Sequence, residues 1–130
     1  MKAIAYSIKP HERESLVLAN GKKHDLTMIS NELNMRTVSY AFGKQVVIVS
    51  ALDIVDSSIL KELKLIGVTH LISRSHSLTH IDLKEAEKLQ IQISHIHYED
   101  YEAAKISLDI IQELDQIQTT EVSRVKSIYS

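Results

Sequence analysis

The sequence predicts an α/β fold in which a parallel sheet lies between two layers of helices. Five short apolar runs of strand length alternate with segments whose apolar residues have helical spacing, which is the pattern of consecutive β-α-β units. The third run, QVVIVSA at 45–51, is apolar and β-branched on both faces, as a strand covered on both sides should be. Both observations favour right-handed crossovers and a single parallel sheet.

The elements follow one another without a linker or an internal repeat. The expected strands cover residues 2–8, 24–30, 45–51, 69–74 and 91–96. The expected helices cover residues 10–20, 34–42, 56–66, 82–89 and 100–117. Pro10 suits the first turn of a helix, and Asp56 and Asp82 are suited to cap the helices that follow them.

The C-terminal segment carries an apolar stripe wider than a lone surface helix needs. We therefore expect residues 100–117 to fold back over the sheet or over a twin subunit. Val122 and the 125–128 stretch indicate a short second helical piece that completes this cover or stays frayed. The predicted organisation is one domain at 1–117, with an extension at 118–130.

Composition excludes several classes of function. With 15 basic and 17 acidic residues in 130, the chain has no field that would attract nucleic acid or an anionic membrane. The absence of cysteine excludes disulfides and thiolate metal sites, and it fits a reducing compartment. No apolar run is long enough for a signal peptide or a membrane span. We expect a cytoplasmic protein without nucleic-acid or membrane partners.

The three glycines narrow the range of ligands. Gly21, Gly43 and Gly67 each follow a helical segment, where a left-handed residue ends a helix at low cost. No glycine remains for a strand-to-helix turn that would let backbone amides approach a phosphate. The sequence therefore contains neither a dinucleotide-binding fingerprint nor a P-loop.

Ligands of open parallel sheets bind beyond the carboxyl ends of the strands. In this chain those ends are residues 7–9, 50–53, 74–79 and 95–99. The third segment belongs to GVTHLISRSHSLTHIDL, a strand that ends in an arginine and is followed by a polar loop with two histidines. A guanidinium suits an anion holder, because its fork matches two oxygens and stays charged.

Three stretches resemble the D-lactate dehydrogenases and the wider D-2-hydroxyacid dehydrogenases. They are MKAIAYSIKPHERE at the N-terminus, QVVIVSALDIVDSSILKELKLIGVTHLISR, and RSHSLTHIDLKEAEKLQIQI. The last is similar to the family stretch in which an arginine precedes Ala-Gly, a turn, Ile/Val-Asp and a helix. The resemblance covers about residues 1–115.

The resemblance implies the substrate (catalytic) domain of that family. This domain is a flavodoxin-like three-layer sandwich with a five-stranded sheet of order 2-1-3-4-5, and it closes over a separate NAD-binding domain. Arg74 matches the family arginine that helps to hold the substrate carboxylate. The implied substrate-binding residues are Arg74, Ser75, His76 and Ser77.

The sequence also departs from the family pattern. His76 and Ser77 replace the Ala-Gly pair, so a β-carbon and an imidazole occupy the approach to the substrate. HYEDY at 97–101 replaces a stretch that contains two prolines. The family's NAD domain and its acid/base residues would lie beyond this chain, and hydride transfer needs both. We expect no cofactor unless a partner chain supplies the NAD-binding domain.

Each candidate residue has a second interpretation. Arg74 is otherwise a surface arginine paired with Glu99 or Asp100, and Asp82 is better interpreted as a helix cap than as a catalytic acid. The remaining candidate cleft residues are Asp53, His95, His97 and Tyr98. Five histidines lie within residues 70–97, and imidazole is a suitable ligand for zinc, copper or nickel. We nevertheless expect these histidines to bind no metal and to form a partly exposed, pH-sensitive group.

Three functions remain open. The first is a degenerate, stand-alone substrate domain, expected to be a homodimer, that binds a small carboxylate, an inorganic anion or a protein partner and is not catalytic alone. The second is one part of a split NAD-dependent D-2-hydroxyacid oxidoreductase completed by a separate chain. The third, flavin binding, rests on the fold alone.

Overall fold

The structure is a computed structural model that describes the backbone of residues 1–129 and the side chains of residues 1–121. It contains one five-stranded sheet in which every pair of neighbouring strands is parallel. The strands are β1 (Lys2–Ala5), β2 (Asp25–Met28), β3 (Val46–Ser50), β4 (His70–Arg74) and β5 (Gln92–Ile96). Their order is β2-β1-β3-β4-β5, which confirms the predicted fold and sheet order.

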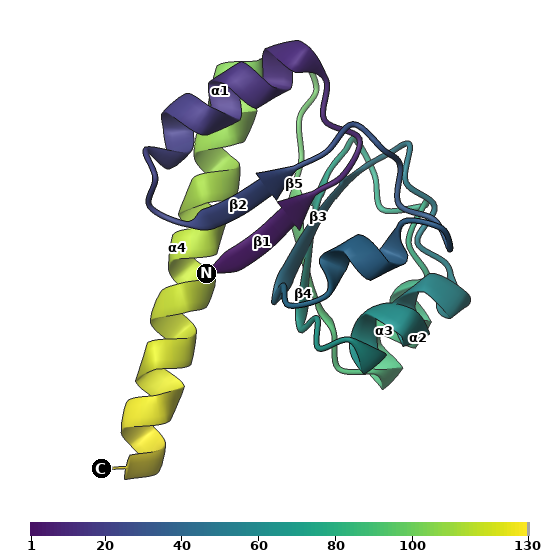
Figure 1. Cartoon of the computed structure of the whole chain (residues 1–130), viewed down its shortest axis with the longest axis vertical. Coiled ribbons are helices and arrows are strands. Elements are labelled where there is room, and N and C mark those ends of the chain that lie inside the picture. The colour runs from purple at the N-terminus through teal and green to yellow at the C-terminus, as the bar shows by residue number, and fades with distance from the viewer. Residues whose placement is uncertain (130) are drawn as a thin grey trace.

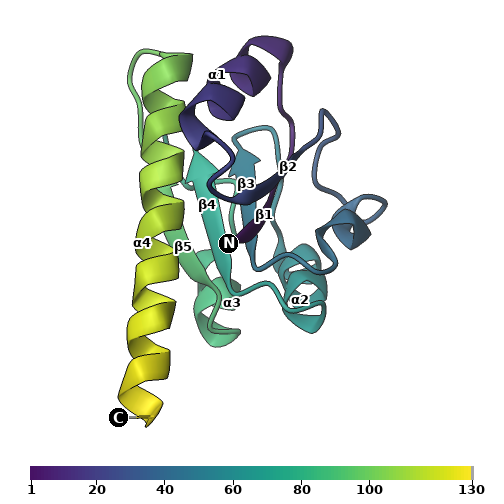
Figure 2. The same cartoon turned by 60° about the vertical axis from the view of Figure 1, so that its left-hand side comes forward.

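Helices cover both faces of this sheet (Figure 1). Helix α1 (Pro10–Asn20) and helix α4 (Ala103–Tyr129) lie on one face. Helix α2 (Ser57–Leu65), helix α3 (Leu83–Lys88) and the 3-10 helix η1 (Val38–Ala41) lie on the other. In Figure 2, which is turned by 60°, α4 runs along one side of the molecule and α2 lies on the other.

Local sequence signals set the helix ends as expected. Pro10 stands in the first turn of α1. The Asp56 carboxylate accepts a hydrogen bond from the backbone N of Ile59 at 3.0 Å, and Asp82 accepts one from Glu85 at 3.1 Å. Both aspartates are therefore N-caps. Gly21 ends α1 with a φ of 51°, a left-handed conformation that glycine adopts without strain.

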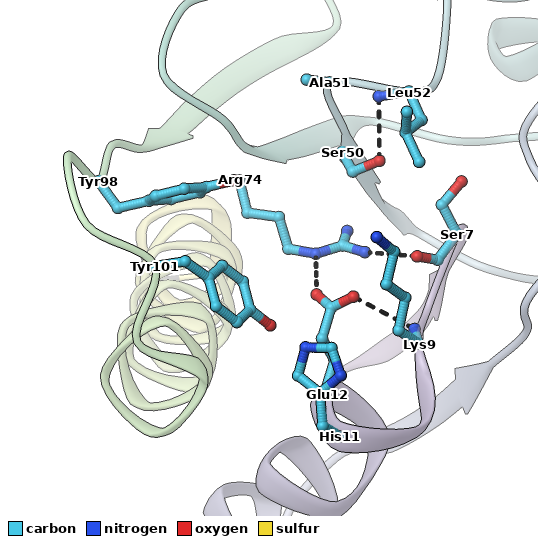
Figure 3. A pocket seen from close by; sticks show the side chains of 10 residues that line it. All are labelled: Ser7, Lys9, His11, Glu12, Ser50, Ala51, Leu52, Arg74, Tyr98 and Tyr101. Atoms are coloured by element: carbon cyan, nitrogen blue, oxygen red, sulfur yellow. Dashed lines mark hydrogen bonds and ion pairs between the residues drawn. The ribbon is translucent and has the colours of Figure 1, made fainter.

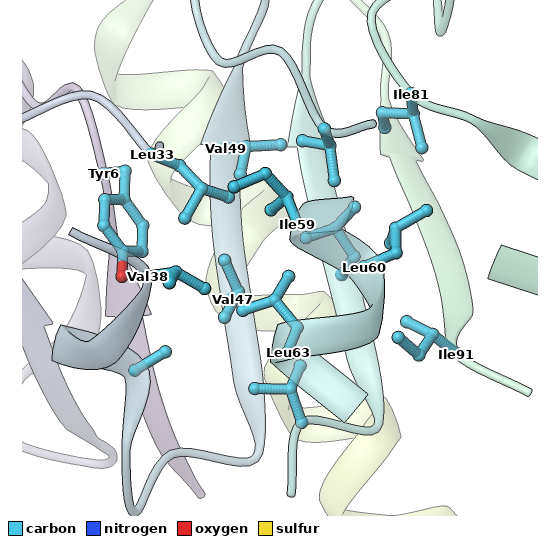
Figure 4. Packing of buried hydrophobic residues seen from close by; sticks show 14 of the residues in the cluster. Tyr6, Leu33, Val38, Val47, Val49, Ile59, Leu60, Leu63, Ile81 and Ile91 are labelled. Atoms are coloured by element: carbon cyan, nitrogen blue, oxygen red, sulfur yellow. The ribbon is translucent and has the colours of Figure 1, made fainter. Parts of the chain in front are cut away.

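The strand side chains alternate between two apolar clusters. Val47 and Val49 face α2, α3 and η1 (Figure 4), whereas Val46 and Ile48 face α1 and α4. All four are fully buried. The central strand β3 is thus covered on both faces, as expected for a parallel sheet between two helix layers.

The segment at 34–42 is not the full helix that its spacing predicts. Only the short 3-10 turn Val38–Ala41 forms. The Asn34 side chain accepts hydrogen bonds from the backbone N atoms of Arg36 (2.9 Å) and Thr37 (3.2 Å), and the Thr37 hydroxyl donates to the carbonyl of Glu32 (2.6 Å). These bonds compete with the helical pattern and favour a turn.

The C-terminal segment folds back over the sheet, as one of the two expectations stated. Buried residues of α4 pack on the α1 face; they are Ile106, Ile110, Ile111, Leu114 and Ile117. The helix is continuous through residue 117 to Tyr129. The side chains of Val122 and of residues 125–128, which were expected to complete the cover, lie outside the described residues. Among the described residues, no helix is both long and apolar enough to cross a membrane.

Candidate functional site

A cavity of about 320 Å³ opens at the carboxyl ends of β1, β3 and β4. Its walls come from the turn after β1, the first turn of α1, the turn after β3, and the segment between β5 and α4 (Figure 3). The lining residues are Ser7, Lys9, His11, Glu12, Ser50, Ala51, Leu52, Arg74, Tyr98 and Tyr101. We call this space the Arg74 cavity.

The turn after β1 is held in an unusual backbone conformation. Ser7 has a φ of 57°, a left-handed conformation that costs a residue other than glycine about 1–3 kcal/mol. Its backbone N donates to the carbonyl of Asn31 at 2.8 Å, and its hydroxyl donates to Asp53 Oδ1 at 2.7 Å. These bonds fix the direction of the Ser7 carbonyl, which accepts a hydrogen bond from Arg74 Nη2 at 3.2 Å.

Asp53 hydrogen-bonds two of the segments that form the cavity walls. Its carboxylate is fully buried and accepts hydrogen bonds from the Ser7 hydroxyl, from the backbone N of Leu33 (2.8 Å) and from the backbone N of Ser50 (2.8 Å). Each of its oxygens is therefore bonded, which is how a buried carboxylate is stabilised. Asp53 is not among the lining residues. It joins the turns that form the walls.

Arg74 lies at the centre of the cavity floor and is only 3 % exposed. Its Nη2 donates to the carbonyls of Tyr6 (3.1 Å) and Ser7, and its Nε donates to Glu12 Oε2 at 3.0 Å. The alternative of a surface pair with Glu99 or Asp100 is therefore wrong. Among the described residues, Arg74 Nη1 is a buried side-chain nitrogen without a hydrogen-bond partner.

Three further lining residues were not singled out as site residues on sequence grounds. Lys9 precedes α1, and its backbone N donates to Glu12 Oε1 at 3.2 Å. The Glu12 side chain is 13 % exposed. Burial and the charge and hydrogen bonding of Glu12 raise the pKa of Tyr101 to about 12, so its hydroxyl stays protonated at neutral pH. The sequence could have identified Lys9 and Glu12 as site residues, because both lie at the start of a helix at the ligand-binding edge of the sheet.

The loop after β4 contributes less to the cavity than expected. Ser75 is fully buried, and its hydroxyl donates to the carbonyl of Ser77 at 2.6 Å. His76 and Ser77 are exposed and do not line the cavity. Of the four predicted substrate-binding residues, the structure brings only Arg74 into the cavity.

The remaining candidates form a row of rings beside the cavity. His76 lies 4.7 Å from Tyr98, and His95 lies 5.6 Å from His97, measured between ring centroids. His95 Nε2 is 2.8 Å from the carbonyl of Ser75. Tyr98 lines the Arg74 cavity, whereas His95 and His97 do not. Within residues 1–121, no group of three or more side chains is arranged to hold a metal ion.

His80 lies next to this row but is partly buried. Its Nε2 is 2.8 Å from the Ser73 hydroxyl, which is itself 2.8 Å from the Ser75 hydroxyl. Burial lowers the pKa of His80 from its usual value of 6.5, since desolvation penalises the charged imidazolium. The neutral ring is therefore part of a buried hydroxyl network.

Comparison with solved structures agrees with the fold. No family model matches the chain. It is 27 % identical to a D-lactate dehydrogenase of Curvularia clavata over 97 % of its own length, and 33 % identical to a 2-hydroxyacid dehydrogenase homolog of Haemophilus influenzae over 72 %. The apo-structure of D-lactate dehydrogenase from Escherichia coli matches 77 % of the chain with a TM-score of 0.73 and 26 % identity.

The relatives of this chain are D-lactate and D-2-hydroxyacid dehydrogenases. The predicted family resemblance is confirmed. The chain spans 38 % of the Curvularia relative and 28 % of the Haemophilus relative, so it corresponds to part of such a dehydrogenase. The pyruvate reductase of Chlamydomonas reinhardtii has the same fold over 98 % of the chain, with a TM-score of 0.71 and 22 % identity.

Proposed function

We propose that this chain is a substrate-type domain that binds a small carboxylate or inorganic anion in the Arg74 cavity and transfers no hydride by itself. The observation that carries the proposal is Arg74 Nη1, a buried nitrogen without a hydrogen-bond partner among the described residues, on a guanidinium that lines the cavity. A buried donor without an acceptor is costly. A ligand oxygen in the cavity would supply that acceptor.

Charge supports an anionic ligand. Arg74 and Lys9 line the cavity with two positive charges, and Glu12 supplies one negative charge. Charge-assisted hydrogen bonds from a guanidinium to a carboxylate are among the strongest in proteins. Because Nη2 and Nε already have acceptors, the guanidinium is held in place before a ligand arrives, which reduces the entropic cost of binding.

Two acidic groups at the site, the Asp53 carboxyl and the Tyr101 hydroxyl, are poorly suited to acid/base catalysis. Asp53 accepts hydrogen bonds on both oxygens and does not line the cavity, and Tyr101 holds its proton at neutral pH because its pKa is raised. An efficient general acid or base has a pKa near the working pH. We therefore propose that any NAD-dependent step requires an NAD-binding unit in addition to the residues described here.

The second candidate function is one part of a split NAD-dependent D-2-hydroxyacid oxidoreductase. It is favoured by the relatives, which are dehydrogenases about three times as long as the matched region. NADH fluorescence separates the two functions. Under the first, the chain with pyruvate gives no NADH signal; under the second, signal and turnover appear when a separate NAD-binding chain is added.

The anion site is tested by calorimetric titration with pyruvate and with sulfate. We expect binding of pyruvate that weakens about fivefold in Lys9→Gln, because one of two attracting charges is lost. Lys61→Gln, an exposed residue of α2 that does not line the cavity, is the matched control and should bind as the unchanged protein does. Absence of binding for both probes would contradict the proposal.

Two further proposals concern the cellular location and the oligomeric state of the protein. A cysteine-free sequence supports a reducing location such as the cytoplasm. The homodimer expected from the sequence stays a prediction, and light scattering coupled to gel filtration tests it. A mass near the 14.7 kDa of one chain would contradict it.

A further inference from the structure

Glu12 places a fixed negative charge inside a cavity that otherwise attracts anions. Its side chain is 13 % exposed and forms an ion pair with Arg74 Nε at 3.0 Å. Its other oxygen accepts a hydrogen bond from the backbone N of Lys9 at 3.2 Å. Figure 3 shows the carboxylate directly below the guanidinium, on the side that faces the Tyr101 hydroxyl.

Both oxygens of this carboxylate have a donor. Oε2 accepts a hydrogen bond from Arg74 Nε, and Oε1 accepts one from the backbone N of Lys9 at the start of α1. These two bonds hold the carboxylate in place, so a bound ligand meets its charge.

The charges of the cavity then determine what it can hold. Two cations and one carboxylate leave one unit of positive charge for the ligand. A ligand with a single carboxylate would accept a hydrogen bond from Arg74 Nη1, near Lys9, and neutralise the remaining positive charge. A second negative group on the same ligand would be confined with Glu12 in about 320 Å³, and like charges at such separations repel strongly where water is partly excluded.

We infer that Glu12 is a specificity-determining residue that restricts the Arg74 cavity to monocarboxylates and rejects dicarboxylates. This inference rests on the proposed anion binding and adds the ligand class. Glu12 acts as an internal counter-charge: it offsets part of the field of Arg74 and Lys9, and it lowers the affinity for any ligand that carries more than one negative charge.

A matched pair of ligands tests this inference. The compounds 2-oxopentanoate and 2-oxopentanedioate have the same carbon chain and differ in one terminal carboxylate. We expect calorimetry to show that the unchanged protein binds the monocarboxylate about tenfold more tightly. In Glu12→Gln the preference should disappear, mainly because the dicarboxylate binds more tightly.

Glu14→Gln is the control for overall charge. Glu14 is an exposed residue of the same helix that does not line the cavity, so this variant changes the net charge equally and should keep the tenfold preference. Glu12→Asp retains the charge and should keep it as well. If Glu12→Gln does not fold, the unchanged protein and Glu12→Asp still test the inference through their preference for the monocarboxylate.

The outcomes separate the inference from the proposed function. Equal binding of the two ligands by the unchanged protein, or a preference that survives in Glu12→Gln, would overturn the role of Glu12 and leave anion binding intact. Binding of neither ligand would overturn the proposed anion site, and the inference with it. A loss of preference in Glu14→Gln would assign the effect to net charge and would also overturn the inference.

Discussion

Two polar regions lie at the carboxyl edge of one sheet, and they are built in opposite ways. The Arg74 cavity rests on buried charges whose hydrogen bonds join four segments of the chain. The histidine row of His76, His95 and His97 is exposed, and its members contact one another mainly through their rings. The cavity is therefore a prearranged site, whereas the row is a surface feature, although the row is the more conspicuous of the two in the sequence.

The difference shows that a high local number of reactive residues indicates a functional site less well than their position relative to the sheet. Five histidines within residues 70–97 suggest a metal site, yet within the described part of the chain no metal-binding group forms. No sequence motif singles out Lys9 and Glu12, but the fold places both beside Arg74 in the cavity. Substitutions in the two regions should therefore have unequal effects.

The largest effect is expected for Asp53→Ala. The change leaves the Ser7 hydroxyl and the backbone N atoms of Leu33 and Ser50 without their buried acceptor, and it releases the left-handed turn at Ser7. We expect a loss of about 4 kcal/mol in the free energy of unfolding, measured by urea denaturation. Asp56→Ala, which removes only a helix cap, is the control and should cost about 1 kcal/mol. Similar losses in both variants would contradict the proposed role of Asp53.

Arg74→Met should have the next largest effect. It removes the partner of the largely buried Glu12 carboxylate and the donor to the Tyr6 and Ser7 carbonyls, so we expect a loss of about 3 kcal/mol. Pyruvate binding should disappear. Arg13→Met removes an exposed arginine with one bond to the Met28 carbonyl and should change stability by less than about 0.5 kcal/mol. Retained binding in Arg74→Met would show that the anion site lies elsewhere.

A smaller effect is expected from pH, through His80. Its pKa is lowered in the folded protein, so the unfolded chain binds the proton more readily. The neutral ring contributes stability that is fully present above the unfolded value of 6.5 and is lost as pH falls from there through the folded pKa. Urea unfolding at a series of pH values should show a smaller loss in His80→Gln than in the unchanged protein. An equal loss in both would assign the pH dependence to other groups.

The smallest effect is expected for His97→Ala. His97 is exposed and lies 3.3 Å from the exposed carboxylate of Glu99, a contact of the kind that contributes little. We expect a change in stability of less than about 0.5 kcal/mol. Zinc should leave the melting temperature of both proteins unchanged. A rise in melting temperature with zinc that is lost in the variant would make the histidine row a metal site after all.

The helices, the strands and the α/β class were mostly predictable because their signals are local, whereas the strand order followed from the family resemblance. Alternating apolar runs, Pro10 in the first turn, and the caps Asp56 and Asp82 each act within a few residues. The 34–42 segment was wrongly predicted as a full helix, because the side chains of Asn34 and Thr37 bond to nearby backbone groups and favour a turn.

The site was only partly predictable, because its contacts are distant in sequence. Arg74 could be singled out by its place at the end of a strand. Its partner Glu12 lies 62 positions away, and the bond from Ser7 to Asp53 spans 46 positions. Such pairings depend on how the strands are ordered and registered, and no local pattern encodes them. Asp53 was predicted as a cleft residue, whereas in the structure it does not line the cavity and instead joins the turns that form its walls.

The packing of α1 against α4 connects the cavity walls to the long C-terminal helix. Glu12 lies on α1, and Tyr98 and Tyr101 lie on the segment that leads into α4. The two helices share one apolar cluster, in which Leu16 meets the buried isoleucines of α4. A displacement of α4 along α1 would therefore move the wall that carries Tyr98 and Tyr101 relative to Glu12, so that a reporter group placed at this helix pair would register whether the cavity is filled.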